Sequence, residues 1–285
     1  MALFAGHAVT TDTIGCGVHF LASDPLDAVA RKAVRVNVSD LVAKGCRPVA
    51  MTLASAWHDG ATEADHAAFA AGLAADLAGY GVTLLGGDTT RLPPGQGPVF
   101  TVTMLGAPLG ARVPDRAGAR AGDAVLVTGT IGDAWLGLRH LTGRRDAAPD
   151  AAAVIAAYRT PAPPVRAAAL IAEHATAGLD VSDGLVADAR HLACASGLRV
   201  VIEAEAIPLS RAGHAFVAAG GTREALCAGG DDYQALVTAG AVGAAALEAA
   251  GATRIGRCEA GTPEVRLLDR RGRDVTPEGG GFVHF

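Results

Sequence analysis

The sequence lacks the features that mark several large classes of protein. Its Lys and Arg residues form no long run and its formal net charge is −5, so the basic surface of a nucleic-acid or anionic-membrane binder is missing. We therefore expect neither nucleic acid nor a membrane as a partner, and phosphate-bearing ligands would need metal ions. No uncharged apolar stretch reaches the roughly 18 residues of a membrane span, and the start, MALFAGHAVTTDT, lacks the basic and apolar regions of a signal peptide.

The cysteines argue against a disulfide framework and against a structural zinc site. There are five, an odd number, widely spaced and without a C-x-x-C pair. This usage is typical of a reducing compartment, and we expect a cytoplasmic protein. No internal repeat stands out, and 285 residues with 50% hydrophobic content can bury one large core or two modest ones.

Apolar spacing in the first 110 residues alternates between the periods of strands and of helices. Thr62 and Asp65 form a capping-box pair that marks the start of one helix. The expected order is a strand at 7–13, a helix at 25–45, a strand at 48–57, the helix from Thr62, a buried strand at 81–87 and a strand at 97–108. This order predicts a sheet with its helices on one face.

A basic stretch dotted with glycine and proline, PLGARVPDRAGARAG (108–122), is typical of a linker. We place the domain boundary there, which gives domains of residues 1–110 and 111–285. In the second domain we expect Asp183 to be the N-cap of a helix whose inward face carries Leu185, Ala189, Leu192 and Ala193. The other expected elements are a strand and helix within 123–138, a helix at 165–175 and a strand at 198–204. The pattern alone supports an α/β or α+β fold with two domains.

Aspartates recur in four short motifs, TTDT, GGDTT, LDVSDG and GGDDY, each placed where an apolar strand gives way to a glycine or a helix start. A bare aspartate beside a buried strand end costs several kcal/mol of desolvation unless it is paired or bound to a cation. Oxygen-only clusters suit Mg²⁺, which prefers carboxylates, waters and substrate phosphates. Each motif also has an ordinary interpretation, as a turn or, for Asp183, as a helix cap. The four together favour a metal site.

The strings TTDTIGCGVHF, VNVSDLVAKGCRP, GGDTTR, TGTIGDA, LDVSDGLVAD, AGGDDYQAL and the terminal GFVHF resemble the thiamine-monophosphate kinases. That family belongs to an ATP-binding superfamily that includes aminoimidazole ribonucleotide synthetase. The match runs in the family's order from about residue 8 to Phe285, and DVSDG is its most discriminating part.

The resemblance implies ATP-dependent phosphorylation of thiamine phosphate to thiamine diphosphate, by direct in-line transfer with Mg²⁺ and without a dedicated catalytic base. It further implies a two-domain fold whose N-terminal sheet pairs with its copy in a homodimer. The implied metal ligands are Thr11, Asp12, Asp40, Asp88, Asp180 and Asp183. The implied ATP-binding residues are Gly87, Asp88, Arg112 and Ser182, and the implied substrate-binding residues are His19, Asp231 and Phe282.

Several of these residues have simpler interpretations when they are taken alone. Arg112 suits a solvated linker, His19 a packed core position and Phe282 a tail residue that closes the core. Asp188 receives no role from the resemblance, and we expect it on a solvated helix face.

Three departures from the family pattern keep other functions open. The glycine-aspartate-aspartate segment usual before the first strand is not in the sequence, Cys16 stands where a glutamate is common, and Asp231 replaces a glutamate. The alternatives are another ATP-dependent enzyme of the superfamily with a different small substrate, or a degenerate nucleotide-binding homologue without catalysis.

Overall fold

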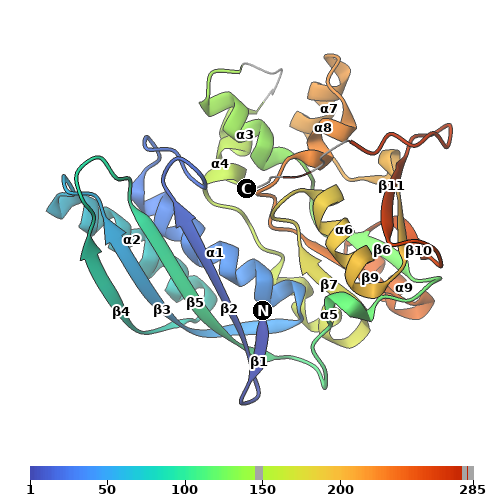
Figure 1. The fold of residues 1–285 in the computed structure, drawn as a ribbon, viewed down its shortest axis with the longest axis horizontal. Coiled ribbons are helices and arrows are strands. Elements are labelled where there is room, and N and C mark those ends of the chain that lie inside the picture. Colours follow the sequence, from blue (N-terminus) through green and yellow to red (C-terminus); the bar gives the residue numbers. More distant parts are fainter. Residues whose placement is uncertain (145–149, 278–280, 282–285) are drawn as a thin grey trace.

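The computed structural model describes residues 1–144, 150–277 and 281, arranged around two β-sheets that lie side by side (Figure 1). Phe282, an expected substrate residue, lies outside the described residues. Within the described ranges, none of the helices combines the length and the apolar character needed to cross a membrane.

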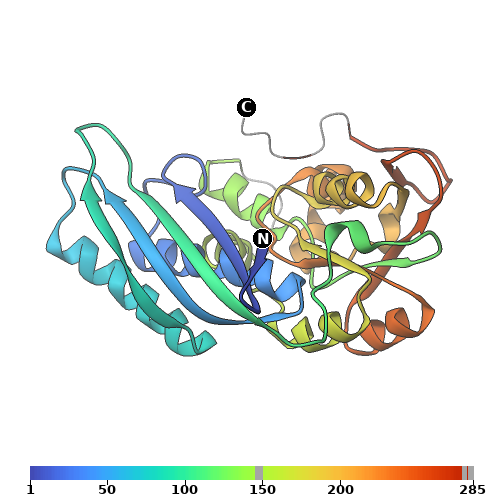
Figure 2. The ribbon, with the colours of Figure 1, turned by 60° about the horizontal axis from the view of Figure 1, so that its bottom comes forward.

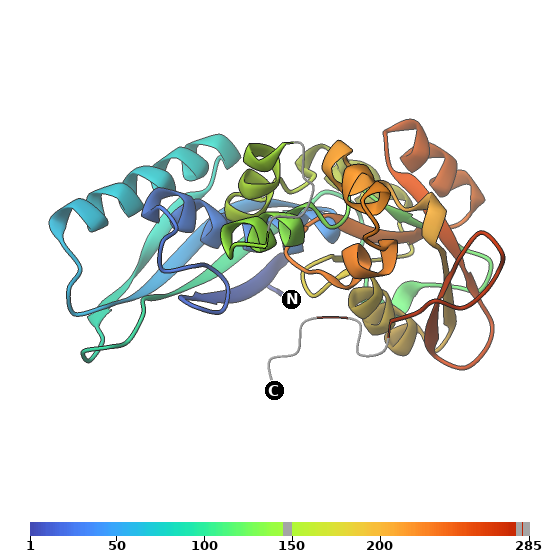
Figure 3. The same ribbon diagram turned by 90° about the horizontal axis from the view of Figure 1, so that it is seen from above.

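The N-terminal sheet has five strands in the order β1-β2-β5-β3-β4, with only β3 and β4 parallel to each other. Helices α1 and α2 pack on one face of this sheet and leave the other open (Figures 2 and 3), as the order of elements predicts. In β5, buried and half-buried residues alternate, because one face meets the helices. The elements are β1 (Ala2–Phe4), β2 (His7–Gly15), α1 (Leu26–Ala43), β3 (Cys46–Trp57), α2 (Glu63–Tyr80), β4 (Thr83–Arg91) and β5 (Val99–Pro108).

Helix α2 begins at the predicted capping box. The Thr62 hydroxyl accepts the backbone N–H of Asp65, and the Asp65 carboxylate accepts the backbone N–H of Thr62 at 2.8 Å. The helix ends at Gly81, whose φ of 66° is a left-handed conformation that glycine adopts without strain.

A strand forms in the region predicted at 81–87, but the prediction that it is buried is wrong. Strand β4 forms, but all nine of its residues are exposed, and the side chains of Leu84 and Leu85 are 43% and 60% exposed. Its apolar run looks like a core strand, yet β4 is an edge strand and β3 is its one partner among the described strands. Two acidic motifs are also misplaced by the sequence argument: TTDT lies inside β2 and GGDTT inside β4, not at strand ends.

The C-terminal sheet has six strands in the order β11-β8-β10-β6-β9-β7, with one parallel pair, β8 and β11. Strands β6, β7 and β9 are buried along their whole length. The strands are β6 (Ala124–Val127), β7 (Ala177–Asp180), β8 (Arg199–Glu203), β9 (Ala235–Ala239), β10 (Thr253–Glu259) and β11 (Glu264–Leu268). The helices are α3 (Asp133–Leu141), α4 (Ala151–Arg159), α5 (Ala168–His174), α6 (Leu185–Ser196), α7 (Arg211–Ala218), α8 (Arg223–Ala228) and α9 (Ala241–Ala249).

The start of α6 differs from the prediction. Its N-cap is Gly184, at φ 115°, and Asp183 makes no side-chain cap. Asp188, expected on a solvated face, is instead only 3% exposed, and its carboxylate accepts the backbone N–H groups of Ser182 and Asp183 at 3.0 Å. The backbone N–H groups of the turn before α6 are therefore hydrogen-bonded by a side chain of the helix itself, because a buried backbone donor must find an acceptor. The predicted inward residues of α6 are all buried.

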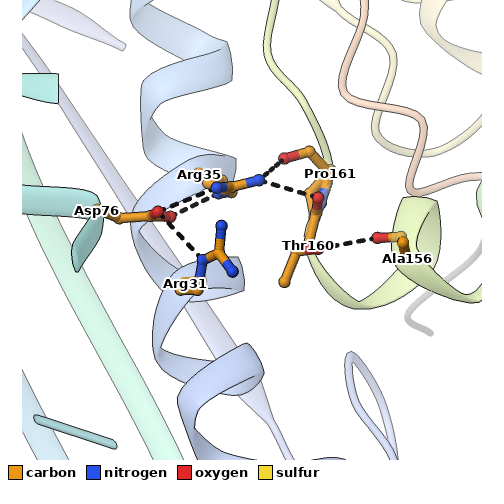
Figure 4. A network of polar contacts seen from close by, with 6 residues as sticks. All are labelled: Arg31, Arg35, Asp76, Ala156, Thr160 and Pro161. Carbon is orange, nitrogen blue, oxygen red and sulfur yellow. Dashed lines mark hydrogen bonds and ion pairs between the residues drawn. The ribbon is translucent and has the colours of Figure 1, made fainter. Parts of the chain in front are cut away.

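Helix α1 connects the two halves, since it packs against β2, β3 and β5 on one side and against β7 and β9 on the other. Figure 4 shows a second connection through Arg35 of α1. Its guanidinium donates to the Asp76 carboxylate of α2 and to the carbonyl oxygens of Thr160 and Pro161, at 3.0 and 2.9 Å. Arg31 donates to the same carboxylate at 3.2 Å. The chain after α4 is thus attached to the N-terminal helices.

Candidate active site

A cavity of about 960 Å³ lies where the two halves meet, and it gathers most of the residues singled out from the sequence. Its walls come from β1, β2, α1, α3, α4, the turn after β7 and the loop before β9. Cofactor and substrate sites commonly occupy cavities of this size between domains. The predicted site residues that line it are Thr11, Asp12, His19, Asp40, Asp180, Ser182, Asp183 and Asp231.

Three of the aspartates in the cavity come from elements far apart in the sequence. Asp12 is on the helix-covered face of β2, and Asp40 near the end of α1 accepts a hydrogen bond from the Thr10 hydroxyl. Asp180 ends β7 and accepts a hydrogen bond from the Ser39 hydroxyl at 2.7 Å. Because Ser39 and Asp40 are adjacent on α1, this helix helps to position carboxylates from both halves.

Burial and a neighbouring carboxylate oppose the ionisation of Asp12 and Asp180. Burial, and then the negative charge of Asp40, raise the pKa of Asp12 to about 7. Burial raises the pKa of Asp180 well above its ordinary value, and Asp40 adds to the effect. Burial also lowers the pKa of Lys44 to about 8. Among the described residues, no lysine or arginine forms an ion pair with Asp12 or Asp180. Neighbouring carboxylates that are wholly or partly buried and lack such a partner are what a bound cation would stabilise.

The donor set fits magnesium. The cavity presents carboxylate and hydroxyl oxygens, which are the ligands that Mg²⁺ takes. Within the described residues, one tight group of potential ligands occurs: single atoms of Asp183, Asp188 and His191 lie within 4.8 Å of one another. Asp12, Asp40 and Asp180 are spaced more widely. That spacing suits ions shared with a polyphosphate better than a single ion enclosed by protein.

The two glycine-flanked aspartate motifs of the C-terminal half pack directly against each other. The backbone N–H of Asp231 donates to the Ser182 carbonyl at 2.8 Å, and that of Tyr233 donates to the Val181 carbonyl at 2.8 Å. A Cβ on Gly230 would lie 2.3 Å from the Ser182 oxygen, so only glycine fits there. The Asp232 carboxylate has a structural role, because it accepts the backbone N–H of Gly132 at 3.0 Å at the start of α3.

Three predicted residues are not brought into the cavity within one chain. Gly87 and Asp88 are on β4, and the register places Asp12 in line with Gly87 across β5 and β3. Three strand spacings separate β2 from β4, about 14 Å. The side chain of Asp88 alternates with that of Gly87 and therefore faces the open side of the sheet, opposite to Asp12. Arg112 is exposed, and its guanidinium contacts the Ala175 carbonyl at 3.5 Å.

The structure also adds residues that the sequence argument missed. Thr10 could have been found, because strand alternation in TTDT places Thr10 and Asp12 on the same face. Arg116 lines the cavity, four residues after Arg112 in the same linker. Trp135 on α3 and Tyr158 on α4 supply aromatic walls, and no local pattern marks either of them. Thr11 borders the cavity but does not turn its hydroxyl into it, because that hydroxyl lies 2.9 Å from the hydroxyl of Thr103 on the open face.

The two sheets and the acidic cavity between them define an AIR synthase related protein. The family model described as "AIR synthase related protein, N-terminal domain" matches residues 3–107, and its C-terminal counterpart matches residues 120–267. Within this group the chain belongs to the thiamine-monophosphate kinase family. These matches confirm the resemblance and the fold class expected from the motifs.

Relatives in that family match over nearly the whole chain. The thiamine-monophosphate kinase of Caulobacter vibrioides is 41% identical over 97% of this chain and 80% of its own length. That of Salmonella typhimurium is 35% identical over 98% of this chain and 86% of its own length. The solved structure of AaThiL complexed with AMPPCP and TMP superposes with a TM-score of 0.88 at 32% identity, covering 100% of this chain and 89% of that one.

Proposed function

We propose that this chain transfers the γ-phosphoryl group of ATP to thiamine phosphate, forming thiamine diphosphate and ADP. The observation that carries the proposal is the cavity itself, in which carboxylates from both halves converge in a chain that belongs to the thiamine-monophosphate kinase family. A relative of this chain has been solved with AMPPCP and TMP together, which agrees with a site that binds a nucleotide and a second ligand at once.

The reaction joins two polyanions, so positioning and charge neutralisation are the main requirements. Bound Mg²⁺ would supply that neutralisation and would stabilise the charge of the transferring group. Asp12 and Asp40 would hold metal ions from the N-terminal wall, and Asp180 and Asp183 from the C-terminal wall. The two phosphates would then meet between the walls, and no side chain is needed to remove a proton from a phosphate acceptor that is already ionised.

For ATP, Ser182 is placed to contact phosphate oxygens, because its side chain lines the cavity between Asp180 and Asp183. We prefer Arg116 to Arg112 as the guanidinium that reaches the nucleotide, since Arg116 lines the cavity and Arg112 does not. Comparison of Arg116→Ala with Arg112→Ala separates the two: the KM for ATP is expected to rise in the first variant and to stay unchanged in the second. A rise in the KM for ATP in Arg112→Ala alone would instead assign Arg112 to the nucleotide, as the sequence resemblance implies.

For thiamine phosphate, we assign His19 and Asp231, which both line the cavity, and we retain Phe282 as a sequence-based assignment. The backbone N–H of Gly15 donates to Nδ1 of His19 at 3.2 Å, which fixes the orientation of its ring. The backbone of Asp231 packs on the turn before α6, and its carboxylate pairs with Lys32 of α1, so the acceptor would bind next to the metal-binding residues of that turn.

We further propose that the active form is a homodimer through the open face of the N-terminal sheet. That face is uncovered, carries threonines in hydrogen-bonded pairs such as Thr13 with Thr101, and includes Asp88. Light scattering would test this directly: a mass of twice the chain is expected, and a monomer at assay concentration would contradict it. The division into residues 1–110 and 111–285 also stays a proposal, supported by the gap between the two family-model matches.

The experiment that tests the proposed function is a coupled ADP-release assay with a panel of acceptors. Thiamine phosphate, thiamine and several other small phosphates would be compared at saturating Mg-ATP. We expect turnover when thiamine phosphate is the acceptor and with none of the other acceptors. Preference for another phosphate would indicate a different enzyme of the superfamily, and absence of turnover with all acceptors despite Mg-ATP binding would indicate a non-catalytic homologue.

A further inference from the structure

A buried lysine lies directly behind the wall of the cavity. Lys32 of α1 is only 1% exposed, which is rare for a lysine unless its charge is compensated. Its ammonium group donates to the Asp231 carboxylate at 2.8 Å and to the His19 carbonyl at 2.8 Å. It also lies 4.0 Å from the centre of the Tyr158 ring, a cation–π distance. The lysine thus contacts three residues that line the cavity without lining it itself.

The carboxylate that Lys32 binds belongs to a strained segment. Asp231 has a φ of 68° and Tyr233 a φ of 50°, both in the left-handed region that residues other than glycine seldom adopt. The Tyr233 hydroxyl donates to the second oxygen of Asp231 at 3.0 Å. Each carboxylate oxygen therefore has one fixed donor inside the protein. Backbone strain of this kind persists only where surrounding contacts enforce it, and it concentrates at functional sites.

We propose that Lys32 is a positioning residue for the acceptor substrate: it holds the Asp231 carboxylate and the His19 segment in the geometry that binds the acceptor. This inference rests on the proposed function. The ion pair also sets the chemistry of the subsite, because the charges of Lys32 and Asp231 cancel. Each Asp231 oxygen keeps a free lone-pair direction, so the subsite accepts N–H donors of a ring amine and does not act as a counter-ion for a ring cation.

Replacement of Lys32 by Met keeps the length and apolar stem of the side chain but removes its charge. The variant is expected to raise the KM for thiamine phosphate by about tenfold or more, the scale of one charge-assisted hydrogen bond. The KM for ATP is expected to change less than about twofold, because the lysine contacts no residue assigned to the nucleotide. A purely structural role would instead lower the amount of active enzyme and leave both KM values alone.

The matched control is Arg31→Met on the same helix. It removes the same charge one residue away, but Arg31 pairs with Asp76 (Figure 4) and is not among the described residues that line the cavity. This variant is expected to leave the KM for thiamine phosphate unchanged. An equal rise in both variants would mean that loss of charge on α1 acts through the fold, and it would overturn the inference.

A second variant keeps the test decisive if Lys32→Met does not fold. Tyr233→Phe removes one hydroxyl from the other oxygen of Asp231 and keeps the buried ring, so we expect a smaller rise, roughly threefold, in the same KM. Adding Lys32→Met to Asp231→Asn is expected to raise this KM by less than Lys32→Met does in the wild-type chain, because the carboxylate is already gone and only the contact with the His19 carbonyl is left to lose. Fully additive effects in that double variant would contradict the proposed coupling between Lys32 and Asp231.

The outcomes separate the inference from the proposed function. If the wild-type chain neither binds nor phosphorylates thiamine phosphate, the proposed function fails and this inference fails with it. If the wild-type chain is active and both Lys32→Met and Tyr233→Phe have an unchanged KM for thiamine phosphate, the inference alone is overturned.

Discussion

Asp12 shows most clearly how a residue that suits a metal site lowers the stability of the metal-free protein. Its carboxylate is half-buried next to Asp40, and both burial and that neighbour oppose its charge. We expect Asp12→Asn to lower Mg²⁺-dependent turnover by at least about 100-fold, as loss of a metal ligand does. The melting temperature without metal is expected to stay level or rise, because a repulsion is relieved.

Asp59→Asn provides the control for this prediction. Asp59 is exposed in the turn after β3 and does not line the cavity, so the same chemical change there should leave turnover and stability as they are. If Asp12→Asn retained normal turnover, or if it unfolded while Asp59→Asn did not, the assignment of Asp12 as a metal ligand would have to be withdrawn.

The raised pKa values predict an unusual pH dependence of stability. Burial raises the pKa of Asp12 and of Asp188 from 3.8 to about 7, so the folded chain holds protons that the unfolded chain releases. The stability from these groups is fully present below about pH 4 and is lost as the pH rises through about 7. The metal-free protein should therefore melt at a higher temperature near pH 5.5 than near pH 8.

Metal should reverse this trend, because Mg²⁺ competes with those protons and binds more tightly as the pH rises. Differential scanning fluorimetry with and without Mg-ATP across this range checks both statements. A metal-free protein that is more stable at pH 8 than at pH 5.5 would show that the carboxylates are ionised without a cation, against the account of the cavity.

Residues differ in how far the sequence could reveal them. The aspartates of DVSDG could be found because the motif is local and specific. Asp188 could not, since its burial depends on backbone donors of the preceding turn. Lys32 directly follows Arg31 in the sequence, where nothing marks one of the two as buried, and its partner, Asp231, is 199 positions away. Pairings over such distances leave no mark in the local pattern.

Elements with their own local signals were predicted well. The capping box of α2 is contained in four residues, and both of its hydrogen bonds form. The burial of β4 was predicted wrongly because an apolar run does not show whether a strand has neighbours on one side or on two. Strand β1, only three residues long, was missed altogether.

The network of Arg35 predicts that one side chain has a large effect on stability. Arg35 neutralises the buried Asp76 and satisfies two carbonyl groups of the segment after α4. Arg35→Ala should destabilise the fold by about 3 kcal/mol or more, the usual cost of breaking a buried pair. Chemical denaturation measures this, with Arg257→Ala as the control. Arg257 pairs with Glu259 at the surface, where an ion pair contributes about 1 kcal/mol at most. Equal effects would contradict the role of Arg35.

At the scale of the whole molecule, Asp88 decides how the site is assembled. It lies on the open face of the N-terminal sheet, away from Asp12 of the same chain. If it acts as a metal and ATP ligand, it acts in a second copy. Asp12→Asn and Asp88→Asn are each expected to be inactive, whereas a refolded equal mixture should regain about a quarter of wild-type activity. That fraction follows because half of the dimers are mixed and each has one intact site.

The control for this experiment mixes two variants of the same cavity, Asp12→Asn and Asp180→Asn. Whatever the pairing of chains, Asp12 and Asp180 line one cavity, so no intact site can form and no activity should return. Recovery in the first mixture but not in the second would support a shared site. Absence of recovery in both would remove Asp88 from the metal and nucleotide assignments.

The central claim is direct phosphoryl transfer from Mg-ATP to thiamine phosphate in the cavity between the two halves. Phosphorus NMR of the purified chain with both substrates tests it most directly, because it identifies every phosphate species. We predict that ATP and thiamine phosphate disappear in equal amounts while ADP and thiamine diphosphate appear, only when Mg²⁺ is present. Release of inorganic phosphate with thiamine phosphate left unchanged, or no loss of ATP at all, would contradict the account.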